Sequence, residues 1–182
     1  MAIATYARVC AKNVAGNSQI WLSEAGNITS ITVVAGEVTV FTMLSSNKFM
    51  EVQPKRDSLI RSDEGTGIGS NISYLHKIEM VFSKLALGVN TLRNSLADAS
   101  PCGIVAVTKD SNGEYWLTGW NDTDLGNRGL ELRIDSGTSG EAATNAEGGL
   151  NSITLETTSG YLDLPLTAAG ITSFADAATA AS

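Results

Sequence analysis

The segment "EGTGIGSN" (64–71) is the first candidate for chemistry, because its glycines stand at every second position. A glycine-rich loop binds phosphate when it follows a buried strand and opens a helix, since backbone N–H groups and the helix dipole then meet the anion. Here the residues before it, 55–63, are highly charged, and those after it are typical of a strand. The lysine and hydroxyl of a nucleotide-binding loop are missing. We therefore expect no nucleotide site and interpret the segment as a sterically permissive loop.

His76 is the single histidine of the chain. An imidazole acts as a general base only when a nucleophile or a carboxylate lies beside it in space, and no neighbour in the sequence supplies one. It alternates with Tyr74 and Ile78, which favours a structural or interfacial histidine on a strand. Cys10 and Cys102 share no close spacing with each other or with His76, so we expect no Cys/His metal site. Whether these two cysteines pair is left open.

Acidic and aromatic side chains gather in the second half of the chain. The acidic ones near a loop are Asp122, Asp124, Glu131 and Asp135. They lack the regular ligand spacing and central glycine of a calcium loop. Trp116 and Trp120 in "YWLTGW" could stack on a sugar, although aromatic residues of a hairpin belong more often to a core or an interface. No cluster with catalytic roles emerges, so we expect a protein that is not an enzyme and that uses no cofactor or metal.

Most of the chain has the pattern of β-strands. β-Branched or alternating stretches predict strands, and they cover 20–24, 30–44, 47–53, 72–83, 128–140 and 150–166. Ala35-Gly36 and Ser159-Gly160 indicate turns between strands. Asp110–Gly113 supplies the Asx residues and the glycine that a tight reversal needs, which predicts a β-hairpin over 102–120.

One segment changes to a helical period. Leu85, Val89, Leu92 and Leu96 recur at helical spacing before Pro101, which predicts one flanking helix over about 85–99. The residues at about 54–71 are interpreted as a long charged loop. The Ala-rich residues 167–182 are weakly patterned, and a flexible tail and a short terminal helix both stay open.

This order of elements predicts a single domain over 1–182. The fold class is mainly β (α+β), a β-sandwich or barrel with one helix laid on it. Since strands and helices do not alternate, a doubly wound nucleotide-binding fold is disfavoured. No segment resembles a signal peptide or a membrane span, from which we expect assembly in the cytoplasm.

The charges of the chain are few and unevenly placed. Charged residues make up 17%, against about 25% in an average soluble domain, and such neutral polar surfaces suit packing against other protein copies. The net charge is −7, and residues 101–182 hold three cations against eleven anions. This acidic half argues against sequence-specific binding of nucleic acid, which needs a basic surface.

The order and texture of the elements resemble the tail-tube proteins of bacteriophages and the related tube proteins of contractile injection systems. The stretches that carry the resemblance are "ITVVAGEVTVFTMLSSNKFMEVQPKRDSLIRSD" (31–63), "YLHKIEMVFSKLALGVNTLRNSLADA" (74–99), "CGIVAVTKDSNGEYWLTGW" (102–120) and "NSITLETTSGYLDLP" (151–165). They are similar to the first sheet and inter-subunit loop, the helix, the hairpin and the closing strand of that family.

The resemblance implies a structural protein of the virion tail that is assembled in the host bacterial cytoplasm. Such proteins form hexameric rings in which the sheets of neighbouring subunits join into an inner barrel. The rings stack through long loops into a tube, and the genome passes through its lumen. The implied partners are further copies of the chain, tail sheath, baseplate or tail-terminator proteins, and passing DNA that is not bound by sequence. The acidic second half of the chain would then face this DNA.

On this resemblance, residues 54–71 form an assembly arm. Its cations would meet carboxylates of an adjacent subunit, its carboxylates would meet cations there, and its glycines would keep it mobile before docking. These residues are Lys55, Arg56, Arg61, Asp57, Asp63, Glu64, Gly65, Gly67 and Gly69. Two alternatives stay open: another structural protein of the virion, such as a capsid decoration or head-fibre protein, and a carbohydrate-binding β-sandwich module that uses Trp116 and Trp120.

Overall fold

The computed structural model describes residues 16–55, 57–68, 71–83, 87–120, 129–138 and 150–179. Within them the chain forms a six-stranded, a four-stranded and a two-stranded sheet together with two α-helices. The predicted mainly β, α+β fold class is therefore confirmed. No described helix has the length and apolar character that crossing a membrane requires.

The six-stranded sheet is the central layer. Its spatial order is β11 (Leu164–Pro165), β8 (Tyr115–Thr118), β7 (Ile104–Asp110), β1 (Asn17–Glu24), β4 (Phe49–Val52) and β12 (Ala178–Thr179). The first five residues of β7 are buried in succession, because both faces of this sheet are covered. The turn from β7 to β8 is the predicted one: the Asp110 carboxylate accepts hydrogen bonds from the backbone N–H groups of Asn112 and Glu114, at 2.8 and 2.9 Å.

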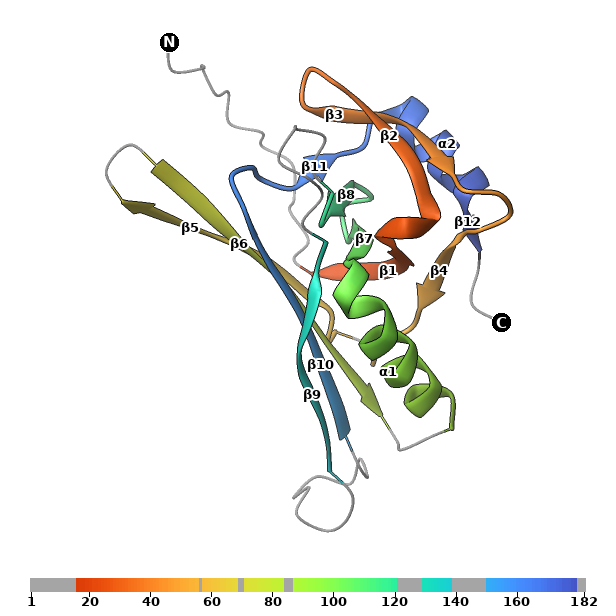
Figure 1. The fold of residues 1–182 in the computed structure, drawn as a ribbon, viewed down its shortest axis with the longest axis vertical. Coiled ribbons are helices and arrows are strands. Elements are labelled where there is room, and N and C mark those ends of the chain that lie inside the picture. Colours follow the sequence, from red (N-terminus) through yellow and green to blue (C-terminus); the bar gives the residue numbers. More distant parts are fainter. Residues whose placement is uncertain are drawn as a thin grey trace.

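The four-stranded sheet covers one face of the central layer. It is antiparallel throughout, in the order β5 (Ile60–Ile68), β6 (Asn71–Ser83), β10 (Leu150–Ser159) and β9 (Glu131–Thr138). Helix α1 (Leu87–Ala99) packs beside it and is followed by a 3₁₀ turn over Ser100–Cys102. Ile78, Met80 and Leu155 are fully buried between these elements and the central sheet. In Figure 1 the β5–β6 hairpin extends well past the body of the molecule.

The second core lies on the opposite face of the central sheet. There β2 (Ile28–Val34) and β3 (Glu37–Met43) form the two-stranded sheet, preceded by a 3₁₀ turn over Ala25–Asn27, and helix α2 (Ala168–Ala177) packs against them. Phe174 of α2 contacts Trp21, Phe41 and Phe49 at ring-centroid distances of 5.3–5.4 Å. Gly170 is required at the helix contact, because a Cβ there would lie 2.2 Å from the Val38 carbonyl oxygen.

Two predictions from the sequence need correction. The long loop at about 54–71 is wrong for residues 60–68, which form β5 in register with β6. The prediction placed the charged side chains in solvent, whereas Arg61 and Asp63, two positions apart on β5, point into the molecule and pair with residues there. The prediction of one helix is incomplete: the expected helix at 85–99 is α1, but the C-terminal segment forms α2 and β12, which is the helical alternative and not the flexible tail.

Candidate functional site

Four charged side chains meet where the β5–β6 hairpin leaves the body of the molecule. Arg61 and Asp63 lie on β5, His76 lies on β6, and Asp163 lies in the connection between β10 and β11. We call these four residues the charged clasp. The side chains of His76 and Asp163 are only 3% and 2% exposed. The clasp therefore joins the four-stranded sheet to the β8–β11 edge of the central sheet through buried ions.

His76 is saturated with hydrogen-bond partners. Its Nδ1 lies 2.8 Å from Asp63 Oδ1 and 3.0 Å from Asp163 Oδ1. Its Nε2 lies 2.8 Å from both the Ser159 hydroxyl and the Tyr161 carbonyl oxygen. Carboxylates on one ring nitrogen and a carbonyl on the other require an N–H at both positions, which is the doubly protonated, charged imidazolium.

The side chain of Asp163 contacts both the four-stranded sheet and the central sheet. Its Oδ2 accepts hydrogen bonds from Arg61 Nη1 at 2.8 Å and from the Thr118 hydroxyl at 2.7 Å. The Arg61 guanidinium also lies 4.5 Å from the centre of the Trp116 ring, within cation–π distance. Each charge of the clasp is thus paired and hydrogen-bonded, as a buried charge must be.

The pKa values follow from this geometry. Burial alone would lower the pKa of His76, but hydrogen bonds to Asp163 and Asp63 and their negative charges outweigh it and raise the pKa to about 10. Burial likewise acts to raise the pKa of Asp63, yet the hydrogen bond to His76 and the charge of Arg61 prevail and lower it. His76 is therefore protonated and Asp63 is ionised at neutral pH. Together with the Arg61 guanidinium and the Asp163 carboxyl group, which contacts both cations, the clasp pairs two cations with two carboxyl groups.

Ser159, His76 and a carboxylate have the spacing of a nucleophilic triad, but their protonation prevents that chemistry. A histidine that is already charged cannot accept the serine proton. The Ser159 hydroxyl is also committed, since it donates to the Tyr161 carbonyl oxygen at 2.6 Å and accepts from the Tyr161 N–H at 3.1 Å.

The same cluster resembles a small metal-ligand set. One ligand atom each from Asp63, His76 and Asp163 lies within 4.8 Å of the others. A divalent cation would have to displace the proton on His76 Nδ1 and share Asp163 with Arg61. Because the charges of the clasp already balance, the donor set does not fit a metal ion. The geometry supports a structural role.

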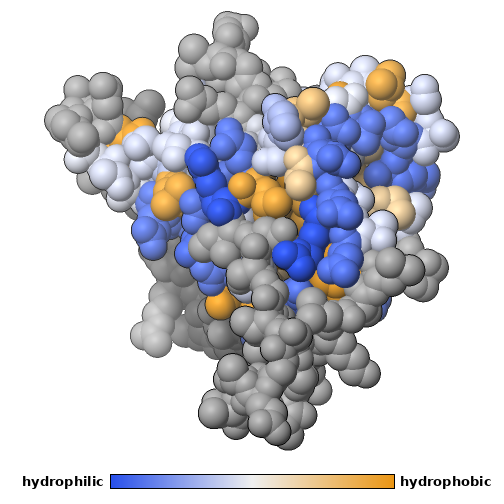
Figure 2. All heavy atoms as spheres, turned by 60° about the horizontal axis from the view of Figure 1, so that its bottom comes forward, coloured by the Kyte–Doolittle hydropathy of each residue, from blue (hydrophilic) through white to orange (hydrophobic). Residues whose placement is uncertain are grey.

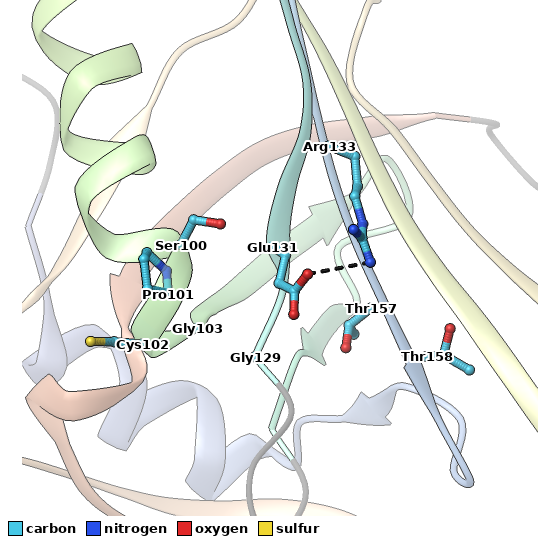
Figure 3. A pocket seen from close by; sticks show the side chains of 9 residues that line it. All are labelled: Ser100, Pro101, Cys102, Gly103, Gly129, Glu131, Arg133, Thr157 and Thr158. Carbon is cyan, nitrogen blue, oxygen red and sulfur yellow. Dashed lines mark ion pairs between the residues drawn. The ribbon is translucent and has the colours of Figure 1, made fainter.

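A shallow pocket of about 470 Å³ lies beside the start of β9. Figure 3 shows Glu131 and Arg133 pointing toward each other there, as an ion pair of 3.3 Å, with the Ser100–Cys102 turn on the other side. The hydrogen bond of the Cys102 thiol to the Glu24 carboxylate raises the pKa of Cys102. This thiol is therefore protonated and a poor nucleophile.

The nine residues of the predicted assembly arm are separated by the structure. Arg56 and Gly69 lie outside the described residues, and Lys55 and Asp57 line a polar groove ahead of β5 with Glu51. Arg61 and Asp63 turn inward to partners of their own chain, whereas Glu64 is exposed. Gly65 faces Tyr74, whose ring would lie 3.2 Å from an added Cβ, and Gly67 pairs with Ile72.

The other predicted groups differ in what the structure describes. Cys10, Asp122 and Asp124 lie outside the described residues. Arg61 lies over the ring of Trp116, and Trp120 is partly buried against the second core. Figure 2 shows hydrophobic residues only as separate spots on the face it presents.

Sequence reasoning missed Ser159 and Asp163, which complete the clasp. They lie more than eighty residues beyond their partners on β5 and β6. One signal was available: Asp163 stands between Leu162 and Leu164 in "YLDLPL", where a charged residue is unusual. No family model, curated protein or solved structure matches this chain.

Proposed function

We propose that the chain is a structural subunit that joins copies of itself into rings and a tube, in the manner of a phage tail-tube protein. The observation that carries the proposal is the four-stranded sheet, whose two outer strands are long and, among the described strands, pair on one side only. β5 has nine residues and pairs with β6, and β9 has eight and pairs with β10. Such edges invite pairing with another chain.

The directions of these two edges suit a closed ring. The sheet has four antiparallel strands, so β5 and β9 run in opposite directions. When one copy is rotated beside another, β9 of the first meets β5 of the second antiparallel. The ladder therefore continues with one pairing type around the whole ring, and no edge is left over.

The stagger of the sheet suits a barrel as well. Glu64 pairs with Leu75 of β6, whereas Ile134 is level with Glu79 through Thr154, four residues farther along. If Glu64 of one copy pairs with Ile134 of the next, each copy is displaced by four residues, about 13 Å, along the strand direction. The width of one four-stranded sheet, measured across its strands, is about 19 Å. For all copies to lie at the same height in a ring, the strands must tilt by about 35° from the ring axis, which is the tilt seen in closed barrels.

Side-chain alternation selects this register over its immediate neighbours. Positions 64 and 134 both align with residues on the face that points away from the core, which we call the outer face. A slip of one residue would place an outer position opposite an inner one. The chosen register also sets all eight residues of β9 against residues 60–67 of β5.

The outer face has the charge that a DNA passage needs. Its charged positions include four carboxylates and two cations, since Arg133 pairs with Glu131 there: Glu64, Lys77, Glu79, Glu131, Arg133 and Glu156. Lys77 is also paired with Glu79 at 2.5 Å. In a ring this face lines the lumen, where excess negative charge repels phosphates and keeps DNA from adhering. The location that goes with this function is the phage tail, after assembly in the bacterial cytoplasm.

The proposal is tested by imaging the purified chain with negative-stain electron microscopy and by locking the joined edges. Glu64→Cys with Ile134→Cys, in a Cys10→Ser, Cys102→Ser background, should give disulfide-linked ladders of copies under mild oxidation. A bond within one copy is excluded, because the two strands are three strand spacings apart, about 14 Å, and a disulfide needs Cα atoms within about 7 Å.

The matched control is Glu64→Cys with Asp135→Cys, which is out of register by one residue. By electron microscopy we expect the purified chain to form uniform rings or tubes. We expect disulfide-linked ladders from the Glu64→Cys, Ile134→Cys pair and none from the control pair. A monomer at all concentrations would contradict the proposal and favour a decoration protein. Equal crosslinking of both pairs would contradict the register.

A further inference from the structure

We infer that the charged clasp is a positioning device that holds β5, the proposed joining edge, at the angle that assembly requires. This inference rests on the proposed function. It assigns a role to Arg61, Asp63, His76 and Asp163 that neither ring formation nor lumen charge explains. Its basis is where the clasp lies along the hairpin.

The clasp lies at the last anchored point of the hairpin. β10 pairs with β6 from Ser83 back to Tyr74, and beyond that Asn71–Ser73 pair with β5 alone. A two-stranded ribbon has little rigidity of its own. The five residue steps from His76 to Asn71 span about 16 Å, so a small rotation at the clasp moves the end of the hairpin by several ångströms.

The contacts of the clasp fix β5 to a different sheet. β5 pairs only with β6 among the described strands, so its backbone ladder does not set the angle between the hairpin and the body. Asp163 does so: it meets Arg61 of β5, His76 of β6 and Thr118 of β8 at 2.7–3.0 Å. Charge-assisted hydrogen bonds of this kind impose direction as well as distance.

Stability alone does not account for four charges at this place. Buried ion networks recover little more than their desolvation cost, and apolar residues of similar volume often give equal or greater stability. The neighbouring inner positions Ile78 and Met80 are held by apolar contacts, which tolerate sliding. An ionic contact fixes one geometry, and a ring closes only if each copy presents its edge at one angle.

The experiment measures the hairpin angle and assembly in the same variants. Spin labels at Ile72→Cys on the hairpin and Asp176→Cys on α2, in the Cys10→Ser, Cys102→Ser background, report the distance by pulsed electron paramagnetic resonance. The test substitution is Asp163→Asn, which keeps the shape and removes the charge. The control is Asp98→Asn, an exposed carboxylate on α1. Unlabelled versions of each are titrated for assembly by light scattering, well below the melting temperature.

We expect one narrow distance for the parent and Asp98→Asn, and a broad distribution for Asp163→Asn. The critical concentration for assembly should rise at least about tenfold in Asp163→Asn alone, which corresponds to about 1.4 kcal/mol. A folded Asp163→Asn with a narrow distance and unchanged critical concentration would overturn the inference.

The test also covers a variant that does not fold and a parent chain that does not assemble. If Asp163→Asn does not fold, Asp63→Asn takes its place, since that side chain is 20% exposed and leaves Asp163 on His76; an unchanged distance distribution then overturns the inference. If the parent chain never assembles, the proposed function fails, whereas the distance measurement on the monomer still tests whether the clasp positions the hairpin.

Discussion

The two halves of strand β6 are attached to the same body by different physics. From Ile78 to Phe82 the inward positions are buried and apolar, and they pack on α1 and the central sheet. From Ile72 to His76 the inward positions hold an exposed isoleucine, a tyrosine over Gly65 and a charged histidine. The apolar half supplies stability in proportion to area, and the ionic half supplies direction.

The comparison shows which kind of contact can fix the orientation of the hairpin. An apolar core is non-directional, and cores accept substitutions if volume and pattern are kept. The clasp has four partners that must all stay satisfied, because one uncompensated buried charge is costly. The half of β6 that projects from the body of the molecule is therefore the half whose attachment tolerates least variation.

The largest effect is expected in the apolar half. Met80 is fully buried, and Met80→Ala removes its side chain from the first core and leaves a cavity. We expect the free energy of unfolding to fall by about 2–5 kcal/mol, measured by urea unfolding. The distribution of distances between spin labels at positions 72 and 176 should stay narrow in the folded protein. A broadened distance would show that the two halves are not independent.

A smaller effect, visible as a pH dependence, is expected at the clasp. The pKa of His76 rises from 6.5 to about 10 on folding, so its contribution is fully present below about pH 6.5 and is lost as the pH rises toward 10. The pKa of Asp63 is lowered below 3.8, so its contribution is present above that pH and is lost as the pH falls through the lowered value.

The measurement compares wild type with His76→Gln by urea unfolding from pH 5 to pH 10. Gln keeps a hydrogen-bond donor but does not titrate. The wild type should lose on the order of 2 kcal/mol more than the variant over this range, since each pKa unit is worth about 1.4 kcal/mol and part of the shift is screened. Parallel curves would contradict a charged His76 in the folded state.

Strand β6 could be predicted from the sequence, and the ionic contacts of its first half could not. Alternation from Ile72 to Phe82 is a local pattern, and it gave the strand and its inner face correctly. The turn at Asp110–Gly113 and helix α1 were equally local. These elements need only neighbours in the sequence, or burial of any kind, to be specified.

The clasp depends on residues that the sequence does not relate. Arg61 and Asp63 were interpreted as loop charges, because charged residues usually face water. Their partner Asp163 lies about a hundred positions away, and only the β10–β11 connection brings it back to the hairpin. The same reasoning assigned Arg61 to a neighbouring subunit, whereas its carboxylate partner lies within its own chain.

The smallest effect is expected at the end of the same face. Ile72 is 57% exposed, so Ile72→Ala should change the free energy of unfolding by no more than about 0.5 kcal/mol. Met80, His76 and Ile72 are spaced four residues apart on one face, and their effects should decrease in that order as packing gives way to the free ribbon. A loss of 2 kcal/mol or more at Ile72, by urea unfolding of the monomer, would mean that the ribbon packs on the body. The clasp would then not be its last anchor, and control of the joining edge would have to be sought nearer the hairpin end.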